Sequence, residues 1–109
     1  MYKFDYHSTT SIILDTAELR DTNIKAALNV TTDCLELFTK HLNRLQAGAQ
    51  KATSEQKLRA WREIDRLLRQ CKACREEIRR LEKELLETQE LIKAAKKGSK
   101  AVSAMILDP

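Results

Sequence analysis

Two long series of apolar residues, spaced alternately by three and four positions, dominate this chain, and a short link containing Gly48 separates them. This spacing keeps one stripe of a helix facing a neighbouring helix. The first series is Ile24, Leu28, Thr31, Leu35, Phe38, Leu42 and Leu45. The second series is Trp61, Ile64, Leu68, Cys71, Cys74, Ile78, Leu81, Leu85, Thr88 and Ile92. The pattern predicts an all-α fold, a long antiparallel helical hairpin with coiled-coil-like packing.

The composition supports helices and argues against a secreted or membrane-spanning chain. The 109 residues include two glycines and one proline, few of the residues that turns and strands require. No apolar stretch approaches the roughly 20 residues that span a bilayer, and the N-terminus lacks the apolar core of a secretory signal. Three cysteines, an odd number, fit reduced thiols better than a disulfide framework. We therefore expect a cytoplasmic protein without a cofactor.

Capping patterns predict where the first helix begins and ends. Asp15 and Glu18 match a capping box, with a carboxylate replacing the usual hydroxyl, and Gly48 supplies a C-terminal stop. The first helix is therefore expected over about 16–47. Residues 1–14, in which aromatic residues alternate with polar ones, are predicted to form an N-terminal arm or a short strand.

Thr53 and Gln56 form a second capping-box pattern, and no Gly or Pro follows until Gly98. The second helix is expected over about 54–97, so that the hairpin covers 15–97. Residues 98–109 are predicted to be an apolar tail that contacts a partner. Its apolar residues are Val102, Met105, Ile106 and Leu107.

Beside the first apolar series, the first helix carries a second apolar stripe. At 100° per residue its members fall next to the first series, so about half of the circumference is apolar. The second stripe comprises Leu19, Val30, Cys34, Leu37 and His41. A two-helix hairpin needs only one stripe, so we expect the second stripe to be the interface of a homodimer that completes a four-helix bundle. Alternatively, the two termini of the same chain or a different protein cover the second stripe.

The spacing in the second helix departs from the heptad at Cys71 and Cys74, where two steps of three occur together. We expect the helix to change its packing partner there. The two cysteines match a unit found in zinc sites, but no second pair accompanies them, so they are interpreted as small core residues. If positions around the link pair antiparallel, Cys34 lies near Leu68 and within about a turn of Cys71. No metal is expected.

Four arginines form a stripe on one face of the second helix: Arg59, Arg62, Arg66 and Arg69. Guanidinium groups suit phosphates and carboxylates, so the arginine stripe is a candidate contact with nucleic acid or with an acidic protein. Acidic residues four positions earlier favour internal pairing instead, as in Glu55 with Arg59 and Asp65 with Arg69. No aromatic residues interleave the stripe to stack on bases.

No catalytic constellation is present, because His41 has no nucleophile or carboxylate that the sequence places beside it. Trp61 is expected to pack over Leu42 or Leu45, whereas an exposed Trp61 would instead indicate a binding hot spot. The leading hypothesis is a non-enzymatic protein–protein interaction module, such as an adaptor, assembly subunit, chaperone or inhibitor. The alternative is a helical dimer that binds nucleic acid through the arginine stripe.

Overall fold

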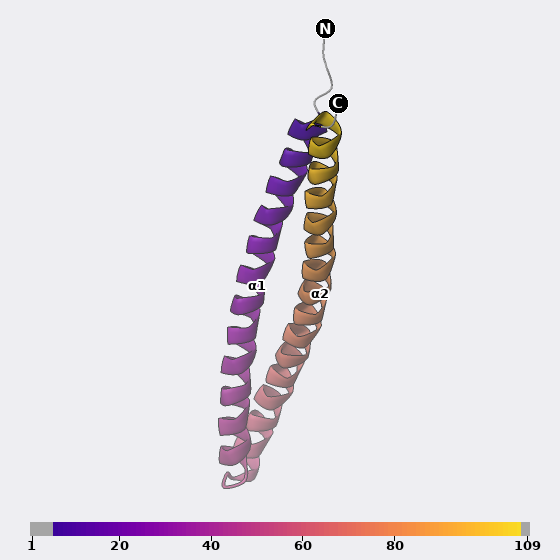
Figure 1. The fold of residues 1–109 in the computed structure, drawn as a ribbon. Helices are drawn as coiled ribbons and strands as arrows, with labels where there is room; N and C mark the ends of the chain where they lie inside the picture. The colour runs from indigo at the N-terminus through magenta and orange to yellow at the C-terminus, as the bar shows by residue number, and fades with distance from the viewer. Residues whose placement is uncertain (1–5, 108–109) are drawn as a thin grey trace. The chain divides into compact units, whose positions relative to one another are not determined.

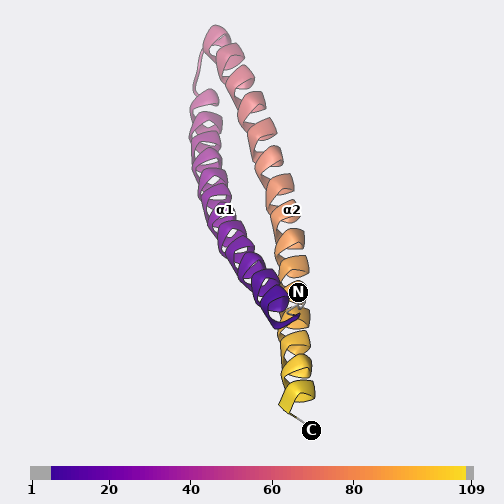
Figure 2. The same ribbon diagram turned by 90° about the horizontal axis from the view of Figure 1, so that it is seen from above.

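The computed structural model describes the backbone of residues 6–107 and the side chains of residue 9 and residues 11–98. Over these residues the chain forms two helices, α1 (Tyr6–Ala49) and α2 (Ser54–Leu107), and no strand. They run in opposite directions and are joined by the link at residues 50–53 (Figure 1). Figure 2 shows the same helices and link from a second direction. The predicted antiparallel helical hairpin is confirmed.

Helix α1 begins well before the predicted capping box. Residues 6–14 are helical, so the predicted arm or strand over 1–14 is wrong where the structure describes it; residues 1–5 lie outside the described residues. The hydroxyl of Thr16 donates a hydrogen bond to the carbonyl of Ile12 at 2.8 Å, one turn back along the helix. Asp15 therefore lies inside the helix. No Gly or Pro precedes Gly48, so nothing interrupts the backbone there.

Two helix boundaries were predicted at the link, the end of α1 and the start of α2, and the structure confirms the second. Helix α1 continues through Gly48 to Ala49, and Gly48 does not adopt a positive φ, so it is not the predicted stop. At the start of α2, the backbone N–H of Thr53 donates to the side-chain oxygen of Gln56 at 3.2 Å. This is the Gln half of a capping box, so the predicted start of the second helix is confirmed.

Helix α2 also extends beyond its predicted end. Gly98 lies within the helix and has no positive φ, so the predicted boundary at 97 and the separate tail from 98 are wrong as far as Leu107. A helix tolerates one interior glycine at a cost of about 1 kcal/mol relative to alanine. The side chains of the four tail residues lie outside the described set, as do residues 108–109. Their contact with a partner stays a prediction.

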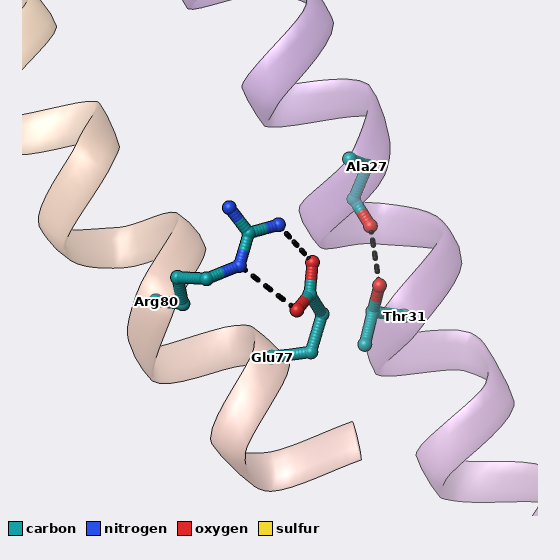
Figure 3. Close-up of polar contacts among 4 residues, drawn as sticks. All are labelled: Ala27, Thr31, Glu77 and Arg80. Atoms are coloured by element: carbon teal, nitrogen blue, oxygen red, sulfur yellow. Dashed lines mark hydrogen bonds and ion pairs between the residues drawn. The ribbon is translucent and has the colours of Figure 1, made fainter. Parts of the chain in front are cut away.

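The hairpin divides into two compact units, and residues 27–81 form the unit around the link. Its core joins Leu42 of α1 to Ile64 and Leu67 of α2. Partly buried residues pack against this cluster, namely Phe38, Leu45 and Ala49. Cys71 is also fully buried. Figure 3 shows polar contacts farther along this unit, where the hydroxyl of Thr31 bonds the carbonyl of Ala27 at 2.8 Å.

The second unit consists of residues 1–26 and 82–109. Among its described side chains, each helix contributes two buried residues: Ala17 and Ile24 from α1, and Thr88 and Ala95 from α2. Thr88 is tolerated in the core because its hydroxyl donates to the carbonyl of Glu84 at 2.8 Å, which satisfies the buried donor. Among these four buried residues, Ile24 is the only large apolar side chain.

The core is thin for the length of the helices. Among the described side chains, nine are buried and ten large apolar side chains are exposed. A chain that buries so little apolar surface commonly completes its core by association. The exposed residues are therefore the candidates for a functional surface.

Candidate interaction surfaces

The second stripe of α1 lies largely on the solvent-facing surface. Leu37 is 65% exposed, Leu19 and Val30 are exposed to nearly the same extent, and His41 is also exposed. Cys34 is half-buried. Neither α2 nor the link covers the four exposed members of the stripe.

Ile12 continues this stripe and was missed by sequence reasoning. It lies seven residues before Leu19, is helical, and is as exposed as Leu19. The interval of seven was a usable signal, since seven residues are close to two helical turns. The prediction of an arm or strand over 1–14 excluded Ile12 from the stripe.

The packing of α2 differs from the prediction at two neighbouring leucines. Leu67 is 1% exposed and Leu68 is 47% exposed, so Leu67 and not Leu68 belongs to the core. On a helical wheel, Leu67 lies on the side of Cys71 and Ile64 that faces Leu42, whereas Leu68 lies on the edge of that face. The predicted core position of Leu68 is wrong for this reason.

Trp61 shares the position of Leu68 at the edge of the packed face, seven residues earlier, and is 63% exposed. The prediction that it packs over Leu42 or Leu45 as a core residue is therefore wrong. Its neighbour Leu58 is also exposed. Exposed tryptophan is enriched among the residues that dominate binding energy at protein interfaces. The structure thus favours the second interpretation of Trp61, a binding hot spot.

An open hollow of about 480 Å³ lies beside Trp61 at the link end of the residue 27–81 unit. Its lining comes from the end of α1 and the link, with Gln46, Ala49 and Gln50, and from α2, with Lys57, Trp61 and Ile64. The lining combines apolar surface with two amides and one ammonium group. Such a mixture suits an apolar side chain whose neighbours are polar or acidic.

The arginine stripe is divided into a paired half and an unpaired half. Arg66 pairs with Glu63, which is half-buried, and Arg69 pairs with Asp65 at 3.0 Å. The hydrogen bonds from Arg66 and its positive charge lower the pKa of Glu63. Within the described part of the chain, Arg59 and Arg62 are exposed and form no ion pair.

The predicted pairing of charges on α2 is only partly confirmed. Asp65 and Arg69 pair as expected. Glu55 forms no ion pair with Arg59. Arg80, which has Glu76 four residues before it, pairs instead with Glu77 (Figure 3). One of these contacts joins Arg80 Nε to Glu77 Oε2 at 3.0 Å. The hydrogen bond lowers the pKa of Glu77.

Positive charge is concentrated around the link, in the segment 43–62, which we call the hairpin end. It holds five basic residues and only one acidic residue, Glu55. The basic residues are Arg44, Lys51, Lys57, Arg59 and Arg62. As far as the structure describes the chain, none of the five forms an ion pair. The hairpin end is therefore a basic surface beside an exposed tryptophan.

The three cysteines lie in the same unit and are free thiols. Burial raises the pKa of the Cys74 thiol, with further contributions from Cys34 and Cys71. Cys34 of α1 is therefore close to the Cys71–Cys74 pair of α2, as the pairing across the link predicts. Within the described part of the chain, no group of three or more Cys, His, Asp or Glu side chains is placed to hold a metal ion.

These environments predict slow thiol chemistry. A raised pKa lowers the thiolate fraction of Cys74, and Cys71 is shielded by burial, so alkylation at mild alkaline pH should be slower than in the unfolded chain. Mass spectrometry of iodoacetamide-treated protein would rank the three sites, with Cys71 last. Protein unfolded in guanidinium chloride is the control. Equal rates at Cys71 in folded and unfolded protein would contradict its place in the core.

Comparison with models of protein families, with curated proteins and with solved structures found no match to this chain. Neither described helix is long and apolar enough to cross a membrane. Any functional assignment must therefore come from the exposed surfaces.

Proposed function

We propose that this chain is a non-enzymatic protein–protein interaction module that acts through the surface of its helical hairpin. The observation that carries the proposal is the exposure of the second stripe on α1, where Leu19, Val30 and Leu37 are each more than 60% exposed. Single exposed apolar residues are ordinary, but a series at helical spacing is typical of an interface. Adaptor, assembly subunit, chaperone and inhibitor are roles that such a module fills.

We propose a second copy of the chain as the partner of this stripe. Val30 and Leu37 are seven residues apart and lie on one face of α1, which they share with Cys34 and with the exposed Asp33. A two-fold contact places Val30 against the partner's Leu37 and Leu37 against the partner's Val30. The product is a four-helix bundle that buries the exposed apolar residues of the second stripe.

We also propose a cytoplasmic location. Support comes from the three free thiols, which fit a reducing compartment.

Binding of nucleic acid is the second candidate function. The observation that favours it is the pair Arg59 and Arg62, exposed and without an ion pair within the described residues. Against it, Arg66 and Arg69 are already neutralised by carboxylates. Such binding would weaken steeply with salt, and each contacting arginine that is removed would reduce the salt slope by about one.

Light scattering on the purified protein, with an absorbance ratio at 260 and 280 nm, separates the two candidates. At high salt we expect a species of twice the 12.5 kDa chain mass, free of nucleic acid. The dimer should persist because its contact is apolar. A monomer at every concentration would contradict self-association. Nucleic acid that co-purifies at low salt and is released by high salt would favour the second candidate.

A further inference from the structure

The hairpin end combines positive charge with exposed apolar surface. Trp61 and Leu58 are exposed there, and Lys57 lies four residues before Trp61, on the same side of α2. Lys57 and Trp61 both line the open hollow. This surface is complementary in charge and polarity to an apolar side chain that has acidic residues beside it.

Segment 82–92 of α2, which we call the acidic segment, combines negative charge with exposed apolar surface. It holds four glutamates and one lysine. Leu86 is 64% exposed, and Leu91 is exposed as well. Glu82 and Glu90 lie four residues on either side of Leu86, so all three share one face of the helix.

The acidic groups beside Leu86 are available to an external partner. Glu82, Glu87 and Glu90 are exposed and form no ion pair within the described residues. The basic groups of the hairpin end likewise form no ion pair within the described residues. The chain thus carries two complementary surfaces, one in each compact unit.

We propose that the hairpin end of one copy binds the acidic segment of a second copy. The side chain of Leu86 enters the hollow beside the partner's Trp61, and the glutamates that flank Leu86 pair with the partner's basic groups. This inference rests on the proposed function, because it names a second contact for the same interaction module. The two surfaces differ, so the contact is heterologous and repeats from copy to copy.

Self-association through these surfaces should depend strongly on salt, unlike the contact through the second stripe of α1. Exposed charges are screened over about 8 Å at physiological ionic strength and over longer distances in dilute salt. We expect assemblies larger than a dimer at about 50 mM salt and dimers at about 300 mM salt, where screening is stronger. Trp61 is the only tryptophan, so its fluorescence should shift to shorter wavelength on assembly.

Charge reversal gives the decisive experiment, read by sedimentation velocity in dilute salt on protein freed of nucleic acid. Lys57→Glu with Arg62→Glu reverses charge at the hairpin end, and Glu82→Lys with Glu90→Lys reverses it on the acidic segment. Each double variant alone should remain a dimer. Mixing the two should restore the larger species, because the reversed surfaces complement each other. Circular dichroism checks that each variant stays helical.

The apolar part of the contact has its own matched pair of variants. Leu86→Ser should abolish both the larger species and the fluorescence shift of Trp61. Ala73→Ser, which introduces the same residue at an exposed position of α2 outside both surfaces, should leave both unchanged. Loss of assembly in both variants would indicate a general effect of serine on α2 and would overturn the assignment of Leu86.

The outcomes distinguish failure of this inference from failure of the proposed function. A dimer at both salt concentrations overturns the head-to-tail contact and leaves the interaction module standing. A monomer at both salt concentrations contradicts both. Mixed variants that fail to reassemble also overturn the contact. If the wild-type hairpin end instead binds nucleic acid and the protein alone shows no assembly, the acidic segment is not its ligand.

Discussion

Replacing Leu67 with alanine should lower the free energy of unfolding by roughly 2 to 5 kcal/mol, the range for a large aliphatic residue removed from a packed core. Leu67 is 1% exposed and belongs to the cluster with Leu42 and Ile64. The loss has two parts, the transfer free energy of the removed methyl groups and the cavity left between the helices. Urea unfolding followed by circular dichroism measures it.

The neighbouring leucine is the matched control. Leu68 is 47% exposed, so Leu68→Ala should cost less than about 1 kcal/mol. Both variants have the same composition and the same change in helix propensity, so their difference reports burial alone. Both must be compared at one protein concentration, because association stabilises the folded state. Equal losses, or a larger loss for Leu68→Ala, would contradict the assignment of Leu67 to the core.

Leu37→Glu should convert the proposed dimer into a monomer. The substitution occurs in both copies of a two-fold contact, so an unfavourable term of about 2 kcal/mol at each site weakens association roughly 1,000-fold. Leu37 is 65% exposed within one hairpin, so the hairpin itself should remain helical. Light scattering at a fixed protein concentration measures the mass, and circular dichroism measures the helix content.

Asn29→Glu is the control for this experiment. It places the same carboxylate at an exposed position of α1 that lies away from the second stripe, and the protein should stay dimeric. A Leu37→Glu variant that remains dimeric would show that the second stripe is not the interface between copies. Dissociation of the control variant would indicate that added negative charge, and not the loss of Leu37, separates the copies.

The start of α2 was predictable from local sequence. The two ends of α1 and the end of α2 were not. The Thr53–Gln56 pattern describes a hydrogen bond within four residues, so neighbours in sequence suffice to make it. The helix start predicted from Asp15 and Glu18 is wrong, because the residues from Tyr6 onward are already helical and no Gly or Pro interrupts them. The boundary at Gly98 failed because glycine permits a helix end without requiring one.

Some properties of the candidate surfaces are likewise predictable from the sequence, and others are not. The second stripe of α1 was predictable as a stripe, because its spacing follows from helical geometry alone. The basic character of the hairpin end is also present in the sequence. The sequence does not show whether the basic groups of the hairpin end are free of ion pairs, because pairing on a helix depends on side-chain geometry. Arg66 pairs with Glu63, whereas Arg59 and Glu55 do not pair with each other.

The fold of two antiparallel helices is predictable from the spacing of the apolar residues, which matches the helical repeat over both arms of the hairpin. The residues that face inward near the link depend on packing between the two helices. Leu67 and Leu68 are adjacent leucines, and a spacing of three or four accepts either one. Packing of Ile64 and Leu67 against Leu42 settles the rotation of α2, and that rotation leaves Trp61 in solvent.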